Sequence, residues 1–280
     1  MSDSENLFAI FHVSLIKHVL KLHITIIQEI RENLNLYFLM YSSTMTPMDK
    51  QKLKKIGLWI LDIALNIAIV LATVLLIEKF LIVPFDIYGP SMCDTLNNID
   101  DKCQSEYGDK VILNKAVYYA SDPDRGDIIV FTPKASDEKF LIKRVIGLPG
   151  ETVEILDGYV YVTNKENPKG TKLEEPYLNE SNLGKTKNFT GPQTVFQVPE
   201  NEYFVLGDNR HSSTDSRSCF SGSYEGCKND LTNAFVPKEN IEGKAWFIFW
   251  PFDKIEVLDD TEYPELETAV QSTTIPSPSK

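Results

Sequence analysis

The sequence predicts a mainly β fold, with antiparallel strands and a small inserted subdomain, preceded by an N-terminal transmembrane helix. Two observations carry this prediction. One continuous apolar stretch is followed by short alternating runs that are rich in Val, Ile, Tyr and Phe. These runs are bounded by Gly, Pro, Asn or Asp, which is typical of strands joined by turns in an antiparallel barrel or sandwich rather than of alternating βαβ units.

Residues 1–55 are predicted to form a cytoplasmic segment that ends in a cluster of lysines between positions 50 and 55. Residues 1–44 are of uncertain status. They fit an amphipathic helix on the inner leaflet, a second span, or sequence upstream of a true start at Met45 or Met48. They lack the small-residue cleavage signal of a secretory leader, so we do not interpret them as one.

Residues 56–77, which read IGLWILDIALNIAIVLATVLLI, are predicted to form the transmembrane helix. The stretch is long enough to cross about 30 Å of hydrocarbon. Asp62 and Asn66 are unfavourable there, although Asp62 lies near the basic end. The alternative is a buried core helix. Because the lysines before the stretch favour the cytoplasmic side, everything after Glu78 is expected on the far side.

Residues 78–258 are predicted to form the extracytoplasmic β domain. Between about 164 and 194 the composition shifts to Lys, Glu, Asn, Gly and Pro, which indicates the inserted subdomain. Residues 218–234 form a second, cysteine-containing insert. Residues 259–280 are predicted to be a disordered tail that is acidic and then rich in Ser, Thr and Pro. The expected strands lie within residues 109–117, 126–131, 139–148, 151–162, 197–208 and 241–250.

Charge and cysteine usage exclude several classes of function. The formal net charge is −12, which argues against a nucleic-acid partner, because neutralising phosphates requires clustered Lys and Arg. Cys93 and Cys103 flank one short loop, and Cys219 and Cys227 flank another, so two local disulfides fit an oxidising compartment. The sequence alone does not fix the connectivity. Neither pair has the CxxC spacing of a zinc site, so we expect no metal site.

Three separated stretches carry candidate chemistry: YGPSMCDTL at 88–96, KFLIKRVIGLPGE at 139–151 and VLGDNRHSSTDSR at 205–217. Ser91 lies in a Gly-Pro turn shortly after the apolar helix, and a serine hydroxyl needs a neighbouring base to become a nucleophile. His211 is a candidate base, but it lies in a polar turn without an orienting acid. Lys143 lies within an apolar run, where burial would lower its pKa towards that of a working base.

The same stretches resemble the conserved boxes of type I signal peptidases, the bacterial leader peptidases that use a serine–lysine dyad and form the S26 family. The resemblance covers the anchor and most of residues 85–250. Its parts are SM at positions 91 and 92 followed by Thr95 and Leu96, RGDIIVF at 125–131, KRVIGLPGE at 143–151, and GDNR at 207–210 followed by SxDSR at 213–217. Four boxes in this order behind a spanning helix are a specific match.

The resemblance implies Ser91 as nucleophile, Lys143 as general base and Ser213 as the hydroxyl that orients the lysine. The amide of Ser91 would donate to the oxyanion. Four further residues, Arg144, Asp208, Asp215 and Arg217, would be structural ion-pair partners. By the same resemblance, apolar side chains would line shallow pockets for small residues one and three positions before the cut: Ile87, Met92, Leu96 and Ile142.

Two departures from the family pattern lie beside the nucleophile. Asp94 stands where the family usually has proline, so we expect the turn to be held differently, with a Cys93–Cys103 disulfide as one candidate. Gly89 stands where some members have a serine that completes the oxyanion hole, which leaves one donor unassigned.

The resemblance implies removal of N-terminal signal peptides from exported preproteins at the bacterial cytoplasmic membrane, close to the secretion translocon. It implies no metal and no organic cofactor. The chain would be single-pass, with its N-terminus inside and its catalytic domain outside. The alternatives are a catalytically silent or single-substrate membrane-anchored domain of the same fold, and a self-cleaving repressor. The spanning helix, and the absence of a DNA-binding segment among the motifs, argue against the repressor.

Overall fold

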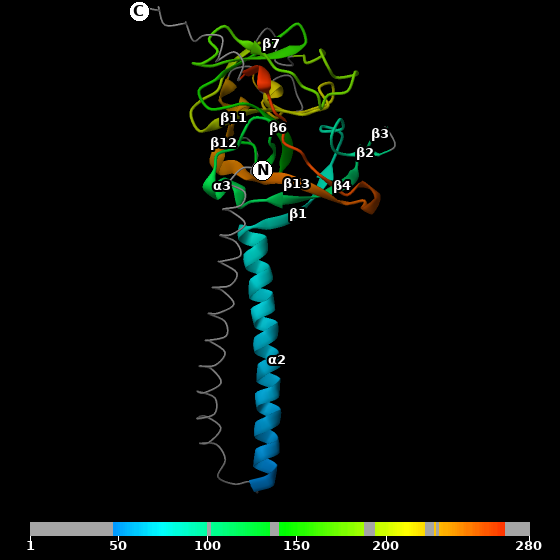
Figure 1. Cartoon of the computed structure of the whole chain (residues 1–280), viewed down its shortest axis with the longest axis vertical. Coiled ribbons are helices and arrows are strands. Elements are labelled where there is room, and N and C mark those ends of the chain that lie inside the picture. Colours follow the sequence, from blue (N-terminus) through cyan, green and yellow to red (C-terminus); the bar gives the residue numbers. More distant parts are fainter. Residues whose placement is uncertain are drawn as a thin grey trace, which may run out of the picture. The chain divides into compact units, whose positions relative to one another are not determined.

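The computed structural model describes residues 47–99, 102–134, 140–187, 194–221, 227 and 230–266 (Figure 1). Predictions for residues 1–44, for most of the Cys219–Cys227 insert and for the tail beyond 266 therefore lie outside the described residues. The chain divides into two compact units, residues 1–78 and residues 79–280. Each is described by itself below.

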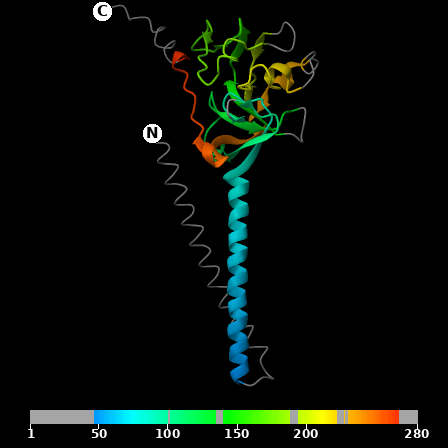
Figure 2. The same ribbon diagram turned by 90° about the vertical axis from the view of Figure 1, so that its right-hand side faces the viewer.

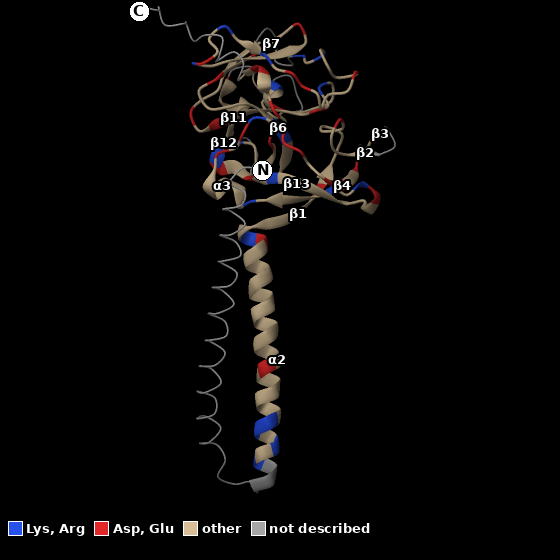
Figure 3. Ribbon diagram, viewed as in Figure 1, with Lys and Arg blue, Asp and Glu red and all other residues tan. Residues whose placement is uncertain are grey.

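The helix α2 (Pro47–Phe80) contains the predicted transmembrane stretch. Within the described part of the chain, Lys50–Phe80 is the one helix that is long and apolar enough to cross a membrane, and an 18-residue window within it has a mean hydropathy of 2.6. Figure 3 shows basic residues gathered near its start and few charged residues along the rest of the helix. The Asn66 side chain donates to the Asp62 carbonyl, and Thr73 donates to the Ile69 carbonyl. These bonds satisfy two polar groups within the helix itself, as an apolar medium requires.

The larger sheet is antiparallel in all its pairings, in the order β1-β4-β13-β5-β6-β11-β12, with β14 paired to β13. This confirms the predicted mainly β, antiparallel fold. Its strands are β1 (Ile82–Tyr88), β4 (Tyr107–Asn114), β5 (Ile128–Phe131), β6 (Leu141–Gly147), β11 (Glu202–Leu206), β12 (Val236–Pro237), β13 (Ile241–Trp250) and β14 (Glu256–Val257).

A second, four-stranded sheet has the order β10-β7-β8-β9. Its strands are β7 (Thr152–Leu156), β8 (Tyr159–Thr163), β9 (Thr171–Lys172) and β10 (Val195–Gln197). This sheet begins at Thr152, earlier than the start near Asn164 expected for the inserted subdomain, because the apolar hairpin β7–β8 pairs with β9 and β10 and not with the larger sheet. The remaining elements are the hairpin β2 (Asn98–Ile99) with β3 (Lys102–Cys103), α3 (Val117–Ala120), and the 3-10 turns η1 (Ser216–Ser218), η2 (Leu231–Ala234), η3 (Lys238–Asn240) and η4 (Phe252–Lys254).

The two sheets share a buried core. Ile146, Phe204 and Leu206 of the larger sheet belong to the same apolar cluster as Val160 and Phe196 of the second sheet. Burial of the apolar surface of these side chains is the main favourable contribution to the packing of the two sheets. Strand β6 is central to the arrangement: it is paired on both edges, with β5 and β11, and it carries both Lys143 and Arg144.

The chain keeps packing contacts beyond the last long strand. The prediction of a disordered tail from about residue 259 does not describe residues 259–266, because Tyr263 is buried and Leu266 packs against the shared core. The sequence did not predict this packing, because two apolar residues in an acidic segment are too few to form a periodic pattern.

Candidate active site

Ser91 stands in a tight turn directly after β1. Gly89 begins the turn with φ +84°, a left-handed conformation that favours glycine. The Cys93 amide donates to the Pro90 carbonyl, and the Leu96 amide donates to the Met92 carbonyl at 2.6 Å. Among the described residues the Ser91 amide donates no hydrogen bond. It is therefore free to donate to an oxyanion.

Asn209, in the loop after β11, holds this turn from the other side. Its backbone amide donates to the Ser91 carbonyl and its side-chain amide donates to the Pro90 carbonyl, both at 3.1 Å. Sequence reasoning did not assign Asn209 a role, although it lies inside the GDNR motif. The two bonds fix the backbone on which the Ser91 hydroxyl is carried.

Lys143 reaches Ser91 from the middle of β6. Its Nζ lies 2.8 Å from Ser91 Oγ and 2.6 Å from the Ile142 carbonyl oxygen, and the residue is 2% exposed. Burial lowers the pKa of Lys143 from 10.5 to about 8, although Asp215 and Asp208 oppose the shift. An amine with this pKa is about half neutral near pH 8. The neutral form can accept a proton from the hydroxyl it touches.

Ser213 is buried next to the same turn, but its hydroxyl makes no hydrogen bond among the described residues. A Cβ atom on Gly207 would lie 2.1 Å from Ser213 Oγ and 2.5 Å from the Ser91 carbonyl oxygen. Glycine is therefore required where these groups meet. The orienting role predicted for Ser213 stays a prediction.

The rival base, His211, is engaged elsewhere. Its ring Nε2 lies 2.9 Å from the Ser181 carbonyl oxygen, and its backbone amide donates to the Asn182 side chain. No hydrogen bond joins its ring to Ser91 within the described ranges. The geometry therefore favours the lysine over the histidine as the base.

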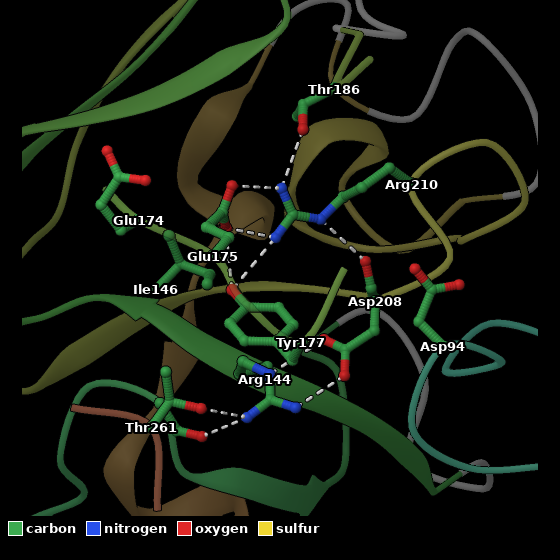
Figure 4. Close-up of polar contacts among 12 residues, drawn as sticks. Asp94, Arg144, Ile146, Glu174, Glu175, Tyr177, Thr186, Asp208, Arg210 and Thr261 are labelled. Carbon is green, nitrogen blue, oxygen red and sulfur yellow. Dashed lines mark hydrogen bonds and ion pairs between the residues drawn. The ribbon is translucent and has the colours of Figure 1, made fainter. Parts of the chain in front are cut away.

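Arg144, the next residue on β6, points to the opposite face of the strand, since side chains alternate. Its guanidinium has five N–H donors, and five bonds are present: two to the Asp208 carboxylate, and one each to the Gly126 carbonyl and the Thr261 and Thr95 hydroxyls. The ring of Tyr177 lies 3.9 Å from its Cζ (Figure 4). Although burial works against the charged form, Asp208 raises the pKa of Arg144 above its ordinary value.

Two further buried ion pairs fix the loop after β11. Arg217 binds Asp215 through two hydrogen bonds, and the second carboxylate oxygen of Asp215 also accepts the Gly207 amide. Arg210 pairs with Glu175, which comes from the predicted inserted subdomain (Figure 4). Arg210 also donates to the Gly207 carbonyl. The pairing of Arg210 with Glu175 was not foreseen, because no sequence pattern connects a polar insert with the GDNR loop.

Asp94 replaces the proline of the family pattern and binds residues of the predicted inserted subdomain. Its carboxylate accepts hydrogen bonds from the backbone and side-chain amides of Asn179, at 2.7 and 2.8 Å, and from the side chain of Asn182 at 2.8 Å. Burial raises the pKa of Asp94 above its ordinary value, while these amides act in the other direction. The turn is thus tied to a loop far away in the sequence.

The neighbouring Cys93 forms a disulfide with Cys103 on β3, with the Cα atoms 5.4 Å apart. Cys219 and Cys227 form the second disulfide. The Ser91 turn is therefore attached covalently to β3 through Cys93 and by hydrogen bonds to the Asn179–Asn182 loop through Asp94.

The four residues predicted to line substrate pockets are brought together in one buried apolar cluster of the larger sheet: Ile87, Met92, Leu96 and Ile142. Two of them, Met92 and Leu96, follow Ser91 in the same turn, and Ile142 directly precedes Lys143. Their role in substrate binding stays a prediction. Among the described residues no group of three or more His, Cys, Asp or Glu side chains is placed to hold a metal ion.

Comparisons with known proteins agree with the residue pattern. The family described as signal peptidase, peptidase S26, matches residues 60–250. Signal peptidase I S of Bacillus subtilis is 35% identical over 197 residues, which cover 69% of this chain and 89% of that protein. Signal peptidase I of Bacillus licheniformis is 35% identical over 201 residues, which cover 70% and 90%.

Among solved structures, a signal peptidase I from Enterococcus faecalis V583 is 38% identical and covers 44% of this chain and 97% of that one, with a TM-score of 0.31, which is too low to bear on the fold. The family match spans more than half of the chain, and the Bacillus relatives are matched over most of their length. The chain therefore belongs to the signal peptidase S26 family and is a serine peptidase.

Proposed function

We propose that this protein is a membrane-anchored endopeptidase that removes N-terminal signal peptides from exported preproteins with a dyad of Ser91 and Lys143. The single observation that carries the proposal is the 2.8 Å contact between Lys143 Nζ and Ser91 Oγ, made by a lysine residue that is 2% exposed. Membership of the signal peptidase family supports the substrate class.

The reaction follows from this contact. The neutral Lys143 amine takes the proton of the Ser91 hydroxyl as Oγ attacks the scissile carbonyl carbon. The Ser91 amide, which has no other acceptor among the described residues, donates to the oxyanion that forms. The Lys143 ammonium then gives its proton to the leaving amine, and the signal peptide remains as an ester on Ser91. Water loses a proton to Lys143 and attacks the ester, and Lys143 returns the proton to Ser91 Oγ.

The substrate would be selected by shape. By family resemblance, Ile87, Met92, Leu96 and Ile142 line the pockets for the residues one and three positions before the cut. In this fold their side chains are almost fully buried in one cluster, so pockets lined by them would be shallow. Large side chains would be excluded because no space exists for them without repacking the cluster.

Two features support work at the membrane surface. The helix α2 is long and apolar enough to span, with a lysine cluster at its start that favours a cytoplasmic N-terminus. Large apolar side chains are also exposed along β13 and after it: Trp246, Trp250, Phe252, Ile255 and Val257. Exposed groups of this kind suit the lipid interface. We further propose that the catalytic domain lies outside the cytoplasmic membrane, near the translocon that delivers preproteins.

The test is cleavage of a preprotein with an Ala-x-Ala site by the purified full-length protein in detergent. Wild type is expected to cut after the second alanine, and Ser91→Ala and Lys143→Ala are expected to lose cleavage. His211→Ala is the control for the rival base and should cleave like wild type. Equal cleavage by wild type and both dyad variants would refute the mechanism. A wild type without activity would instead favour a binding domain or a dedicated enzyme for one substrate.

A further inference from the structure

The chain continues past Trp250, where the family match ends, and its next residues pack onto both sheets. We call Leu258–Leu266 the strap. The Leu258 amide donates to the Trp246 carbonyl, and its side chain packs against the apolar cluster that contains Met92 and Leu96. At the other end, Tyr263, which is 9% exposed, lies in the core shared with the second sheet. Figure 2 shows this orange-to-red segment running from one sheet to the other.

Polar contacts reinforce the far end of the strap. The side chain of Glu265 accepts the Glu174 amide at 2.9 Å, and the Leu266 carbonyl accepts from the Asn167 side chain at 3.3 Å. Both partners belong to the second sheet's subdomain. The strap is thus anchored in one core by Leu258 and in the other by Tyr263 and Leu266, which fixes the residues between these anchors.

Thr261 lies between these anchors and contacts Arg144. Its hydroxyl accepts the Arg144 Nη1 hydrogen at 3.1 Å, and the other Nη1 hydrogen is donated to the Gly126 carbonyl at 2.9 Å. A Cβ atom on Gly126 would lie 2.8 Å from the Thr261 carbonyl oxygen, so the strap rests directly on the Gly126 backbone. Thr261 therefore supplies the last of the five acceptors that the guanidinium needs.

Arg144 connects this contact to the nucleophile turn. The Asp208 Oδ2 atom accepts both from Arg144 Nη2, at 2.7 Å, and from the Thr95 hydroxyl, at 2.6 Å. Thr95 belongs to the Ser91 turn, since its amide donates to the Met92 carbonyl. A rotation of the guanidinium would therefore move the carboxylate that holds the turn, as well as the strand position next to Lys143.

We propose that the strap is part of the peptidase's catalytic unit and that Thr261 is a positioning residue, which holds Arg144 and Asp208 in the arrangement that sets the Ser91–Lys143 contact. The inference rests on the proposed function and adds to it a segment beyond the residues matched by the family. Thr95, Arg144 and Thr261 also line a cavity of about 820 Å³. Water can therefore reach the guanidinium when the hydroxyl is removed, so the variant should fold while losing fixed geometry.

The test compares Thr261→Val, which removes the hydroxyl at constant shape, with Thr261→Ser, which keeps it. Thr132→Val is the matched control: Thr132 is also half-buried, and its hydroxyl makes no hydrogen bond among the described residues. Preprotein cleavage in detergent is measured against substrate concentration and pH. Thr261→Val should lower kcat about tenfold with KM within about twofold, because geometry and not binding is disturbed. Thr261→Ser and Thr132→Val should stay within about twofold of wild type.

The pH profile separates a positioning role from a loss of stability. Asp215 and Asp208 raise the pKa of Lys143, and Arg217 lowers it. If Arg144 moves away from Asp208 in the variant, the Asp208 charge is less neutralised and raises the pKa of Lys143 further, so the acidic limb of kcat should move to higher pH. A lower melting temperature with unchanged kcat and pH limb would overturn the positioning role, as would a Thr261→Ser variant as slow as Thr261→Val. Loss of cleavage by wild type itself would refute the proposed function and not the strap contact.

Discussion

Lys143 and Arg144 are neighbours on β6 and each is 2% exposed, yet the two faces of the strand differ in how fully they compensate a buried positive charge. On one face the amine contacts the Ser91 hydroxyl and the Ile142 carbonyl, and among the described residues no carboxylate is hydrogen-bonded to it. On the other face the guanidinium has five bonds, two of them to Asp208. The pKa of the lysine falls to about 8, whereas that of the arginine rises.

This difference separates a reactive group from a scaffold. Burying a charge is costly unless it is paired and fully hydrogen-bonded. Incomplete compensation makes the proton on Lys143 easy to lose, which a general base requires. Complete compensation keeps Arg144 charged and fixed. The chemical types suit the two tasks, since an amine can shift its pKa across the neutral range and a guanidinium cannot.

The largest expected effect comes from exchanging the type of cation on the reactive face. Lys143→Arg should lower preprotein cleavage by about 10³-fold or more, because a guanidinium stays protonated and cannot accept the Ser91 proton. The measurement is single-turnover cleavage at pH 8. Lys143→Met serves as the control without a titrating group and should be equally inactive. Appreciable activity in the arginine variant would show that another group acts as the base.

Substitutions on the Arg144 face of β6 should mainly lower the free energy of unfolding. Asp208→Ala leaves the Arg144 charge buried without its carboxylate, and we expect a loss of about 3–5 kcal/mol in the free energy of unfolding. Urea denaturation of the full-length protein in detergent measures it. Lys143→Met, which removes an amine whose charged form burial disfavours, should cost much less. Equal losses in both variants would contradict the comparison between the two faces.

Proton uptake by Lys143 gives the third prediction. The folded pKa of about 8 lies below the ordinary value, so the base is neutral above about pH 8 and is progressively protonated below it. In that range kcat should fall about tenfold per pH unit. Cleavage rates from pH 6 to pH 9 on a substrate without titrating side chains near the cut test this. A rate that still rises about tenfold per pH unit up to pH 9 would indicate a solvated lysine with its ordinary pKa.

Much of this site could be predicted from the sequence, but the residues on the Lys143 face of β6 were more predictable than the contacts on the Arg144 face. The motifs around Ser91 and Lys143 are local, and the apolar run FLIKRVIGL predicts that the lysine lies on a strand. The run alone favours a solvated face of that strand, and the resemblance to the family motifs favours the buried one. The resemblance also suggested that Arg144 and Asp208 serve as ion-pair partners. These inferences depend on residues close together in the chain, whose geometry is set by strand and turn periodicity.

The contacts that complete the scaffold were not predictable in this way. Thr261 binds Arg144 across 117 positions, and Glu175 binds Arg210 across 35. Both acceptors lie in polar, acidic segments that were assigned to a disordered tail and to an insert. A single polar residue carries no periodic signal, and its partner is chosen by how the two sheets pack. Tertiary packing therefore decided which of many acidic or hydroxyl side chains became buried acceptors.

Asp94, in the Ser91 turn, gives the smallest expected effect. Its carboxylate has three acceptor bonds to Asn179 and Asn182, whereas an asparagine at this position would turn an N–H towards one of these donors. Asp94→Asn should therefore cost about 1 kcal/mol in the free energy of unfolding. It should also slow cleavage a few-fold, because the turn stays attached through the Cys93–Cys103 disulfide and the Thr95–Asp208 bond.

Glu180→Ala is the control in the same loop, since the Glu180 side chain is exposed and makes no hydrogen bond among the described residues. A double-mutant cycle between Asp94→Ala and Asn182→Ala measures the coupling directly, with an expected value of about 0.5–1.5 kcal/mol. Zero coupling would show that the loop of the second subdomain does not stabilise the Ser91 turn through Asp94. Coupling in stability together with an unchanged cleavage rate would assign Asp94 to the scaffold alone. A change in both would place it among the groups that position the nucleophile.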